Sequence, residues 1–297
     1  MIDPSLPAEA LRGGSVPTRP LPAGAWDCHS HVFGPFDRYP LAPEAKYRPP
    51  LAPAAMRDAV LRRAGFARGV VVHAAATGFD ISGVIDAAGN SSVGTVPIVV
   101  IPESSPAADI ERLVGQGVRG LRFTDMGEQI AERTGAGILG LRALRRMAPM
   151  MKEVGWQAHV WARCGHLLSE AAWLQDSGIP VVLDHMGQFD PAQGPAGGEF
   201  ASLLDLVGAG NVWVKLTSAR ITRRPRRDAS DIRPFHDAFV ERFPTRVLWG
   251  SDWPYIAMDA DLPEIGGQVD LFDSWVDDAA IRHRVFVENP GRLYGTR

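Results

Sequence analysis

The chain has 297 residues, of which 45% are hydrophobic and 22% are charged, and its formal net charge is −3. This composition is typical of a globular protein with a large core, and it gives no electrostatic reason to expect nucleic acid or a membrane surface as a partner. The two cysteines exclude a disulfide framework and favour a reducing cytoplasm. No run of roughly 18 apolar residues predicts a membrane-spanning helix.

The first 24 residues are rich in proline and glycine and predict an extended arm. Short apolar runs rich in valine, isoleucine and leucine follow, and each is succeeded by an amphipathic stretch. The apolar runs predict strands buried on both faces of a parallel sheet, over residues 25–32, 69–74, 96–101, 117–123, 156–162, 179–185, 212–218 and 246–252. The stretches between them predict helices, including residues 54–65, 139–155 and 231–243.

Eight strands that alternate with helices predict an α/β fold, a single-domain (β/α)8 TIM barrel over residues 25–297 behind the arm at 1–24. A doubly wound open sheet is the alternative. In a barrel of this kind the chemistry lies at the carboxyl ends of the strands, so the polar residues at those ends are the candidates for a site.

The polar residues at or near predicted strand ends are His29, His31, His159, Asp184, His185 and Asp252. His29 and His31 are two residues apart in one strand and should face the same space, while Cys28 should point away from them. A lone histidine at a strand end is usually a hydrogen-bonded structural residue. Together, four histidines and an acid at one rim form a cluster of the metal-ligand type.

This set resembles the amidohydrolase superfamily, of the amidohydrolase-2 type. The stretch DCHSHVFGPFDRYPLAPEAKYRPP is similar to the amino-terminal signature of the branch that contains 2-pyrone-4,6-dicarboxylate lactonase. The runs GFARGVVV, GVRGLRF, VVLDHMG, VLWGSDWP and VENPGRLYG match the same branch in order. The resemblance therefore spans nearly the whole chain.

The resemblance implies roles for individual side chains. It places His29, His31, His185 and Asp252 in the catalytic group, and Arg122, Tyr47 and Arg220 in contact with the substrate. Three positions depart from the lactonase: Ala75 replaces a serine, Trp161 a tyrosine, and Glu128 lies near the place of an arginine. We therefore expect a shared reaction type, a different substrate, and Trp161 lining the pocket.

His159 raises the question of a metal ion, because the lactonase is metal-free and has an apolar residue there, whereas metal-dependent decarboxylases of the superfamily have a zinc-binding histidine. His29, His31, His159 and Asp252 would suit one Zn²⁺ or Mn²⁺ with an open position for water. The alternative is a site without a metal, in which His159 only forms hydrogen bonds. Strand four ends LRFTD without a lysine, which disfavours a lysine-bridged pair of metals.

The expected function is hydrolysis of a lactone ring in a small carboxylated substrate, as in aromatic compound catabolism. Asp252 would activate water, and the histidines would polarise the carbonyl group. The expected partner is a small anionic lactone, and we expect a cytoplasmic monomer or small homo-oligomer. The alternatives are a metal-dependent decarboxylase or hydratase of the same superfamily, and a catalytically silent barrel that only binds a ligand.

Overall fold

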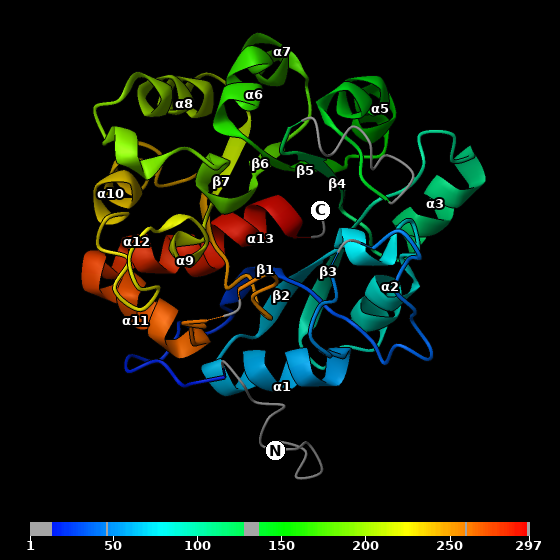
Figure 1. Cartoon of the computed structure of the whole chain (residues 1–297), viewed down its shortest axis with the longest axis horizontal. Coiled ribbons are helices and arrows are strands. Elements are labelled where there is room, and N and C mark those ends of the chain that lie inside the picture. The colour runs from blue at the N-terminus through cyan, green and yellow to red at the C-terminus, as the bar shows by residue number, and fades with distance from the viewer. Residues whose placement is uncertain (1–13, 46, 128–136, 259, 296–297) are drawn as a thin grey trace.

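The computed structural model describes residues 14–45, 47–127, 137–258 and 260–295. The predicted arm is thus described from residue 14 onward, and Glu128 lies outside the described residues. Figure 1 shows the strands in the middle of the molecule with the helices arranged around them.

All paired strands of the sheet are parallel, and they follow one another in chain order. The strands are β1 Trp26–Ser30, β2 Arg68–Val72, β3 Gly94–Val99, β4 Gly120–Asp125, β5 Gln157–Ala162, β6 Val181–Leu183, β7 Val212–Leu216 and β8 Val247–Trp249. A parallel bridge between Ser30 and Trp253 joins the first strand to the chain after the last, so the barrel is nearly closed. The predicted (β/α)8 barrel is confirmed, and the open sheet is not.

The connections between the strands carry most of the helices. The α-helices are α1 Ala54–Ala64, α2 Ser82–Gly89, α3 Ala107–Gly115, α5 Leu141–Glu153, α6 Cys164–Ser169, α7 Ala171–Asp176, α8 Gly198–Ala209, α9 Ser218–Ile221, α10 Arg233–Arg242, α11 Ile265–Trp275, α12 Ala279–His283 and α13 Asn289–Tyr294. The short 3₁₀ and π turns are η2 Ala75–Thr77, η4 Asp184–Gly187, η5 Pro191–Gln193 and η6 Arg284–Glu288. Helix α13 closes the amino-terminal end of the barrel, where Tyr294 stacks on Trp26 with ring centroids 5.9 Å apart.

A bulge in β1 changes which side chains face the barrel interior. The pairing between β1 and β2 slips between Asp27 and Ser30, so the alternation of side chains is interrupted there. Cys28 consequently packs in the interior cluster with Trp26 and Val70, while His29 is buried against interior polar groups as well. The prediction that Cys28 points away from the histidines is wrong, because strict alternation does not hold across a bulge.

Strands β1, β2, β3, β6, β7 and β8 end earlier than predicted, and the early ends of β6 and β8 change the backbone of two site residues. Strand β6 ends at Leu183 and β8 at Trp249, whereas the predicted strands continued through His185 and Asp252. His185 has φ 51° and Asp252 has φ 62°, in the left-handed region that ends a strand. Non-glycine residues are held in this region only where the surrounding structure enforces it, as at many functional sites.

The described part of the amino-terminal arm packs on the outer helices. Oγ1 of Thr18 donates a hydrogen bond to Asp270 of α11 over 2.9 Å, and Arg282 of α12 donates to the carbonyl of Pro20 over 3.0 Å. Within the described ranges, none of the helices combines the length and the apolar character needed to cross a membrane.

Candidate active site

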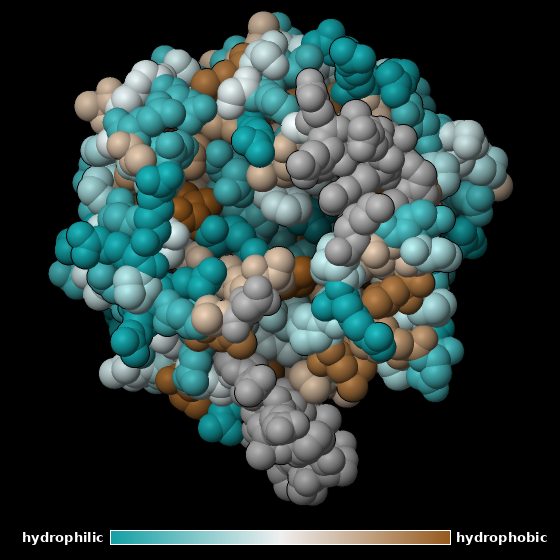
Figure 2. All heavy atoms as spheres, in the orientation of Figure 1, coloured by the Kyte–Doolittle hydropathy of each residue, from teal (hydrophilic) through white to brown (hydrophobic). Residues whose placement is uncertain are grey.

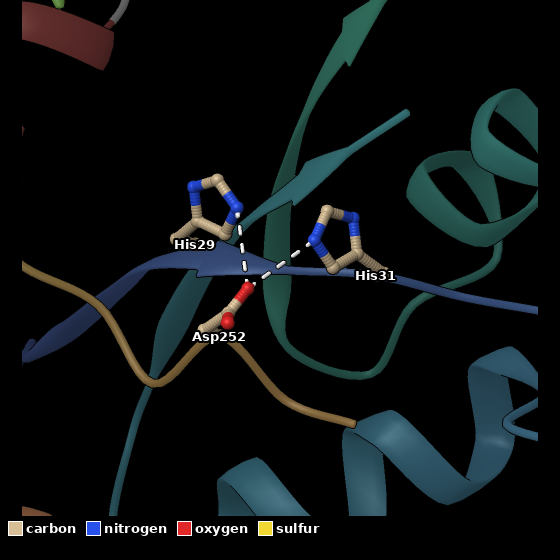
Figure 3. A group of neighbouring side chains, drawn as sticks. All are labelled: His29, His31 and Asp252. Atoms are coloured by element: carbon tan, nitrogen blue, oxygen red, sulfur yellow. Dashed lines mark ion pairs between the residues drawn. The ribbon is translucent and has the colours of Figure 1, made fainter. Parts of the chain in front are cut away.

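Asp252 meets His29 of β1 and His31, which directly follows that strand, at the carboxyl end of the barrel (Figure 3). Its Oδ1 lies 3.6 Å from Nε2 of His29 and 3.5 Å from Nε2 of His31. The backbone fixes this arrangement, because Asp252 N–H donates to the carbonyl of His29 and His31 N–H donates to that of Trp253, each over 2.8 Å. All three side chains are buried, so a reaction here would be shielded from bulk water.

A buried carboxyl group holds the β8 end against β1. Oδ1 of Asp27 accepts a hydrogen bond from Ser251 N–H over 2.9 Å, and Oδ2 accepts one from Ser251 Oγ over 2.7 Å. Burial raises the pKa of Asp27 to about 6, although the contacts to Ser251 oppose that shift. This pair positions the residue that directly precedes Asp252 and thereby supports the site.

His185 completes the predicted catalytic group. Its ring centroid lies 4.9 Å from that of His29, and its Nδ1 lies 3.0 Å from Oγ1 of Thr217, just after β7. Burial lowers the pKa of His185 to about 3, so the ring is neutral at physiological pH. Burial also lowers the pKa of His31, whose Nδ1 donates to the carbonyl of Val72 over 2.7 Å.

A charged network lies beneath these histidines, inside the barrel. Nζ of Lys215, on β7, lies 3.0 Å from Nδ1 of His29 and 2.9 Å from Nδ1 of His159. The same Nζ lies 2.9 Å from Oδ1 of Asp184, and all four side chains are fully buried. Burial acts to raise the pKa of Asp184, but the charge of Lys215 and the contact to His29 outweigh it and hold that pKa well below its usual range.

The structure places His159 in this network and not beside Asp252. Its Nδ1 contacts Lys215, and its Nε2 lies 3.3 Å from Oε1 of Gln157. The described group whose ligand atoms approach one another within 4.8 Å consists of His29, His31 and Asp252. The predicted ligand set therefore keeps three of its members, because both ring nitrogens of His159 are engaged elsewhere.

A pocket of about 380 Å³ opens above the site. Figure 2 shows hydrophilic side chains around a hollow near the middle of this face. The volume suits a small ligand. The predicted residues that line it are His31, Tyr47, Ala75, Arg122, Trp161, His185, Arg220 and Asp252. His73, after β2, and Arg163, after β5, also line the pocket.

Arg122 projects from β4 into the pocket. Its NH1 donates to the carbonyl of His73 over 2.7 Å, its Nε lies 3.5 Å from Oδ2 of Asp184, and its guanidinium carbon lies 5.6 Å from the centre of the Trp161 ring. These contacts fix the guanidinium group, and Nε forms no hydrogen bond within the described residues. Trp161 is held in turn, because its Nε1 donates to Oε1 of Gln188 over 2.9 Å.

Arg220 contacts the predicted base directly. Its Nε donates to Oδ2 of Asp252 over 2.6 Å, its NH2 contacts the same oxygen, and its NH1 donates to the carbonyl of Ile256 over 2.8 Å. Burial acts to raise the pKa of Asp252, but the charge of Arg220 and the neighbouring histidines hold it well below its usual range. Asp252 is therefore ionised at neutral pH.

Sequence reasoning missed Lys215 beneath the rim and gave Asp184 no role in the site. Lys215 lies within the apolar run VWVKLTS, and Asp184 directly precedes His185. A signal was available, because Lys215 lies two residues after Trp213 in a strand predicted to be buried on both faces. A buried lysine needs acceptors close to it, so its position indicated a polar network. Asp184 was placed at the end of the sixth predicted strand together with His185, but only His185 was given a role.

The spacing of His29, His31 and Asp252 would suit a divalent ion, but their hydrogen bonding does not. His31 presents an Nε2 lone pair, since its Nδ1–H donates to a carbonyl group. His29 differs, because the Lys215 amine lies against its Nδ1. An imidazole that accepts at Nδ1 carries its proton on Nε2, and that nitrogen cannot then bind a metal. In this arrangement the donor set does not fit a metal ion held by both histidines.

Comparisons with known proteins show the family of the chain. Residues 26–296 match the model of a family described as Amidohydrolase. The chain is 32% identical over 292 residues to a 4-sulfomuconolactone hydrolase of Rhizobium radiobacter, which covers 97% of this chain and 96% of that protein. It is 33% identical over 291 residues to a 2-pyrone-4,6-dicarboxylate hydrolase of Comamonas testosteroni, which covers 94% and 93%. A ligand-free crystal structure of an Agrobacterium tumefaciens protein aligns with a TM-score of 0.82 at 26% identity, covering 95% of this chain and 99% of that one.

Proposed function

The chain belongs to the amidohydrolase family, and on that premise we propose that it is a hydrolase that opens the lactone ring of a small anionic substrate, with Asp252 activating the attacking water. The observation that carries the proposal is the position of Asp252, an ionised carboxylate within 3.6 Å of two imidazoles at the floor of a pocket lined by arginines. Both curated relatives described above are lactone hydrolases, which does not favour the decarboxylase or hydratase alternative.

The proton path follows from this geometry. Asp252 takes a proton from water, and the resulting hydroxide attacks the lactone carbonyl carbon to give a tetrahedral oxyanion. A proton on Nε2 of His29, a nitrogen without a hydrogen-bond partner among the described residues, stabilises that oxyanion, and His185 faces the same space. The ring C–O bond then breaks, and Asp252 returns its proton to the leaving oxygen. The new carboxylic acid ionises at neutral pH, so each turnover releases one proton.

Two arginines supply anion recognition. Arg122 presents a guanidinium group that can bind a carboxylate or sulfonate, and its contact to the His73 carbonyl holds it in the pocket. Arg220 already pairs with Asp252, so a substrate anion would compete with Asp252 for it. Partial transfer of Arg220 to the substrate would leave Asp252 more basic when water is in place. Tyr47 and Trp161 complete the walls.

Neither Zn²⁺ nor Mn²⁺ takes part in this mechanism, because Lys215 opposes the form of His29 that a metal needs. The proposal also includes a cytoplasmic location, since Cys28 and Cys164 are both buried and unpaired with each other. We propose a monomer or small homo-oligomer that acts on a small molecule alone.

A panel of lactones tests the proposal. The panel contains rings with a carboxylate, as in the substrate named for the Comamonas relative, rings with a sulfonate, as for the Rhizobium relative, and the matched methyl esters. We expect ring opening with one proton released per turnover and a preference for the anionic members. Release of CO₂, or tight binding without turnover across the panel, would contradict the proposal and would favour the decarboxylase or the silent barrel.

A further inference from the structure

Lys215 is buried at the centre of the barrel without direct access to the pocket. Its side chain is 0% exposed, and it does not line the pocket that contains Asp252. Burying an ammonium group is costly unless acceptors surround it. Lys215 is therefore expected to act through the side chains that it contacts and not on the substrate directly.

Three polar atoms surround Nζ of Lys215, two of them in hydrogen bonds and one in an ion pair. Nδ1 of His159 lies at 2.9 Å, Nδ1 of His29 at 3.0 Å and Oδ1 of Asp184 at 2.9 Å. Oδ1 of Asp184 has no hydrogen-bond partner among the described residues, so its contact to Nζ is an ion pair, which favours the charged ammonium group. A neutral amine would remove the nearest positive charge from the buried carboxylate of Asp184, which the Nε of Arg122 approaches only to 3.5 Å. The geometry thus favours the ammonium form, with both imidazoles accepting at Nδ1.

We propose that Lys215 is a positioning residue that fixes His29 in the tautomer with its proton on Nε2. The tautomer of His29 does not depend on the proposed function, but the catalytic role that follows from it rests on that function. In this tautomer the Nε2–H bond is directed toward Asp252, whose Oδ1 lies 3.6 Å away, and toward an oxygen atom bound between them. His29 then acts as a hydrogen-bond donor to the reacting carbonyl.

Asp184 supplies the competing arrangement. Its Oδ1 lies 3.3 Å from Nδ1 of His29, so a proton on Nδ1 could be donated to this carboxylate if the lysine were absent. Nε2 would then present a lone pair beside Nε2 of His31 and Oδ1 of Asp252, whose ligand atoms lie within 4.8 Å of one another. Lys215 therefore determines whether Nε2 of His29 is a hydrogen-bond donor or a metal ligand, and it favours the donor.

The first test reads the tautomer directly in the ligand-free wild-type protein. Long-range ¹H–¹⁵N correlation of histidine rings distinguishes protonated from unprotonated nitrogen, and a His29→Gln variant assigns the signals. We expect a protonated Nε2 and an unprotonated Nδ1 for His29. A protonated Nδ1 would overturn the inference. Because no substrate is present, this result does not depend on the proposed reaction.

The second test removes the lysine. In Lys215→Met we expect the His29 proton to move to Nδ1, and we expect the variant to bind one equivalent of Zn²⁺, measured after dialysis, where the wild type binds none. We expect kcat to fall about 10²-fold, the loss typical of one oxyanion donor, with KM little changed. An unchanged tautomer, or stoichiometric zinc on the wild type through His29, would overturn the inference.

Two controls make this result specific. His159→Gln keeps an acceptor for Lys215, so the tautomer of His29 should stay as in the wild type. The double variant Lys215→Met/Asp252→Asn should lose the zinc bound by Lys215→Met, because one ligand is gone. If Lys215→Met does not fold, the spectrum of the wild-type protein alone decides. If the wild-type spectrum shows the proton on Nε2 of His29 but the lactone panel shows no turnover, the proposed function is refuted and the tautomer is not.

Discussion

Arg220 donates from its Nε to Oδ2 of Asp252 over 2.6 Å, on the side of the carboxylate opposite the two imidazoles. The predicted base is thus already paired with a cation in the ligand-free protein. This explains why the pKa of a buried carboxyl group lies low, since burial alone would raise it. Arg220 was expected to contact substrate, and its pairing suggests that it exchanges between Asp252 and an anion.

Arg220→Gln should shift the acid limb of the pH profile to higher pH. Arg220 and the neighbouring histidines hold the pKa of Asp252 well below its usual range, so the acid limb of kcat/KM that reports Asp252 should lie at low pH. Without the arginine, only the histidines oppose the effect of burial, so the pKa of Asp252 rises and activity should be lost at a higher pH than in the wild type. Arg223→Gln, an exposed arginine just after helix α9, which carries Arg220, is the matched control. Superimposable profiles for Arg220→Gln and the wild type would refute this role.

Arg122→Met should weaken anion binding more than it slows the chemical step. Losing hydrogen bonds to a charged group costs about 1.5–3 kcal/mol, so KM for a carboxylated lactone should rise roughly 10- to 100-fold. Arg122→Lys should restore only part of the affinity for the anion, since a lysine cannot form the two parallel hydrogen bonds that a guanidinium group forms with a carboxylate. The comparison is steady-state kinetics on the acid and on its methyl ester. An equal rise in KM for both substrates would show that Arg122 does not recognise the anion.

Acid should destabilise the fold through two buried neutral histidines. Burial lowers the pKa of His73 and of His185 to about 3, from 6.5 in the unfolded chain. Below pH 6.5 these histidines bind protons in the unfolded state, whereas in the folded state they remain neutral. The stability that they contribute above pH 6.5 is therefore lost as the pH falls toward 3. Each histidine contributes a slope of about 1.4 kcal/mol per pH unit. The free energy of unfolding of His73→Asn, measured with urea at several pH values, should fall less steeply with decreasing pH than that of the wild type. An unchanged pH dependence would contradict this assignment.

Metal removal should leave activity intact. The Lys215 contact favours a proton on Nε2 of His29, which opposes metal binding there. Dialysis against a chelator, followed by metal analysis and a lactonase assay, should show full activity in metal-depleted protein. Loss of activity that added Zn²⁺ restores would instead support the ligand set of His29, His31 and Asp252.

Much of the architecture was predictable because each strand is a short apolar run followed by a helix. The convergence of His29, His31 and Asp252 followed from the rule that chemistry lies at the carboxyl ends of barrel strands. The orientation of Cys28 was not predictable, since a bulge in β1 breaks the alternation and leaves no mark in the sequence.

The polar network was harder to predict, because it depends on contacts between strands that are distant in the chain. His159 shares a strand with pocket-lining Trp161 and looks like a ligand by spacing alone. Only the three-dimensional arrangement shows that Lys215, on β7, contacts its Nδ1. The early ends of β6 and β8 reflect left-handed backbone at His185 and Asp252, which residue type does not specify.

The central claim is that Asp252 activates water, and Asp252→Asn tests it most directly. Asparagine keeps the size of the side chain and still accepts a hydrogen bond from Arg220, but it cannot take the proton. Single-turnover ring opening of an anionic lactone should slow by about 10²- to 10⁴-fold, the usual contribution of a general base, while substrate binding and the circular dichroism spectrum remain close to wild type. Ring opening at near wild-type rate by the folded variant would contradict the account.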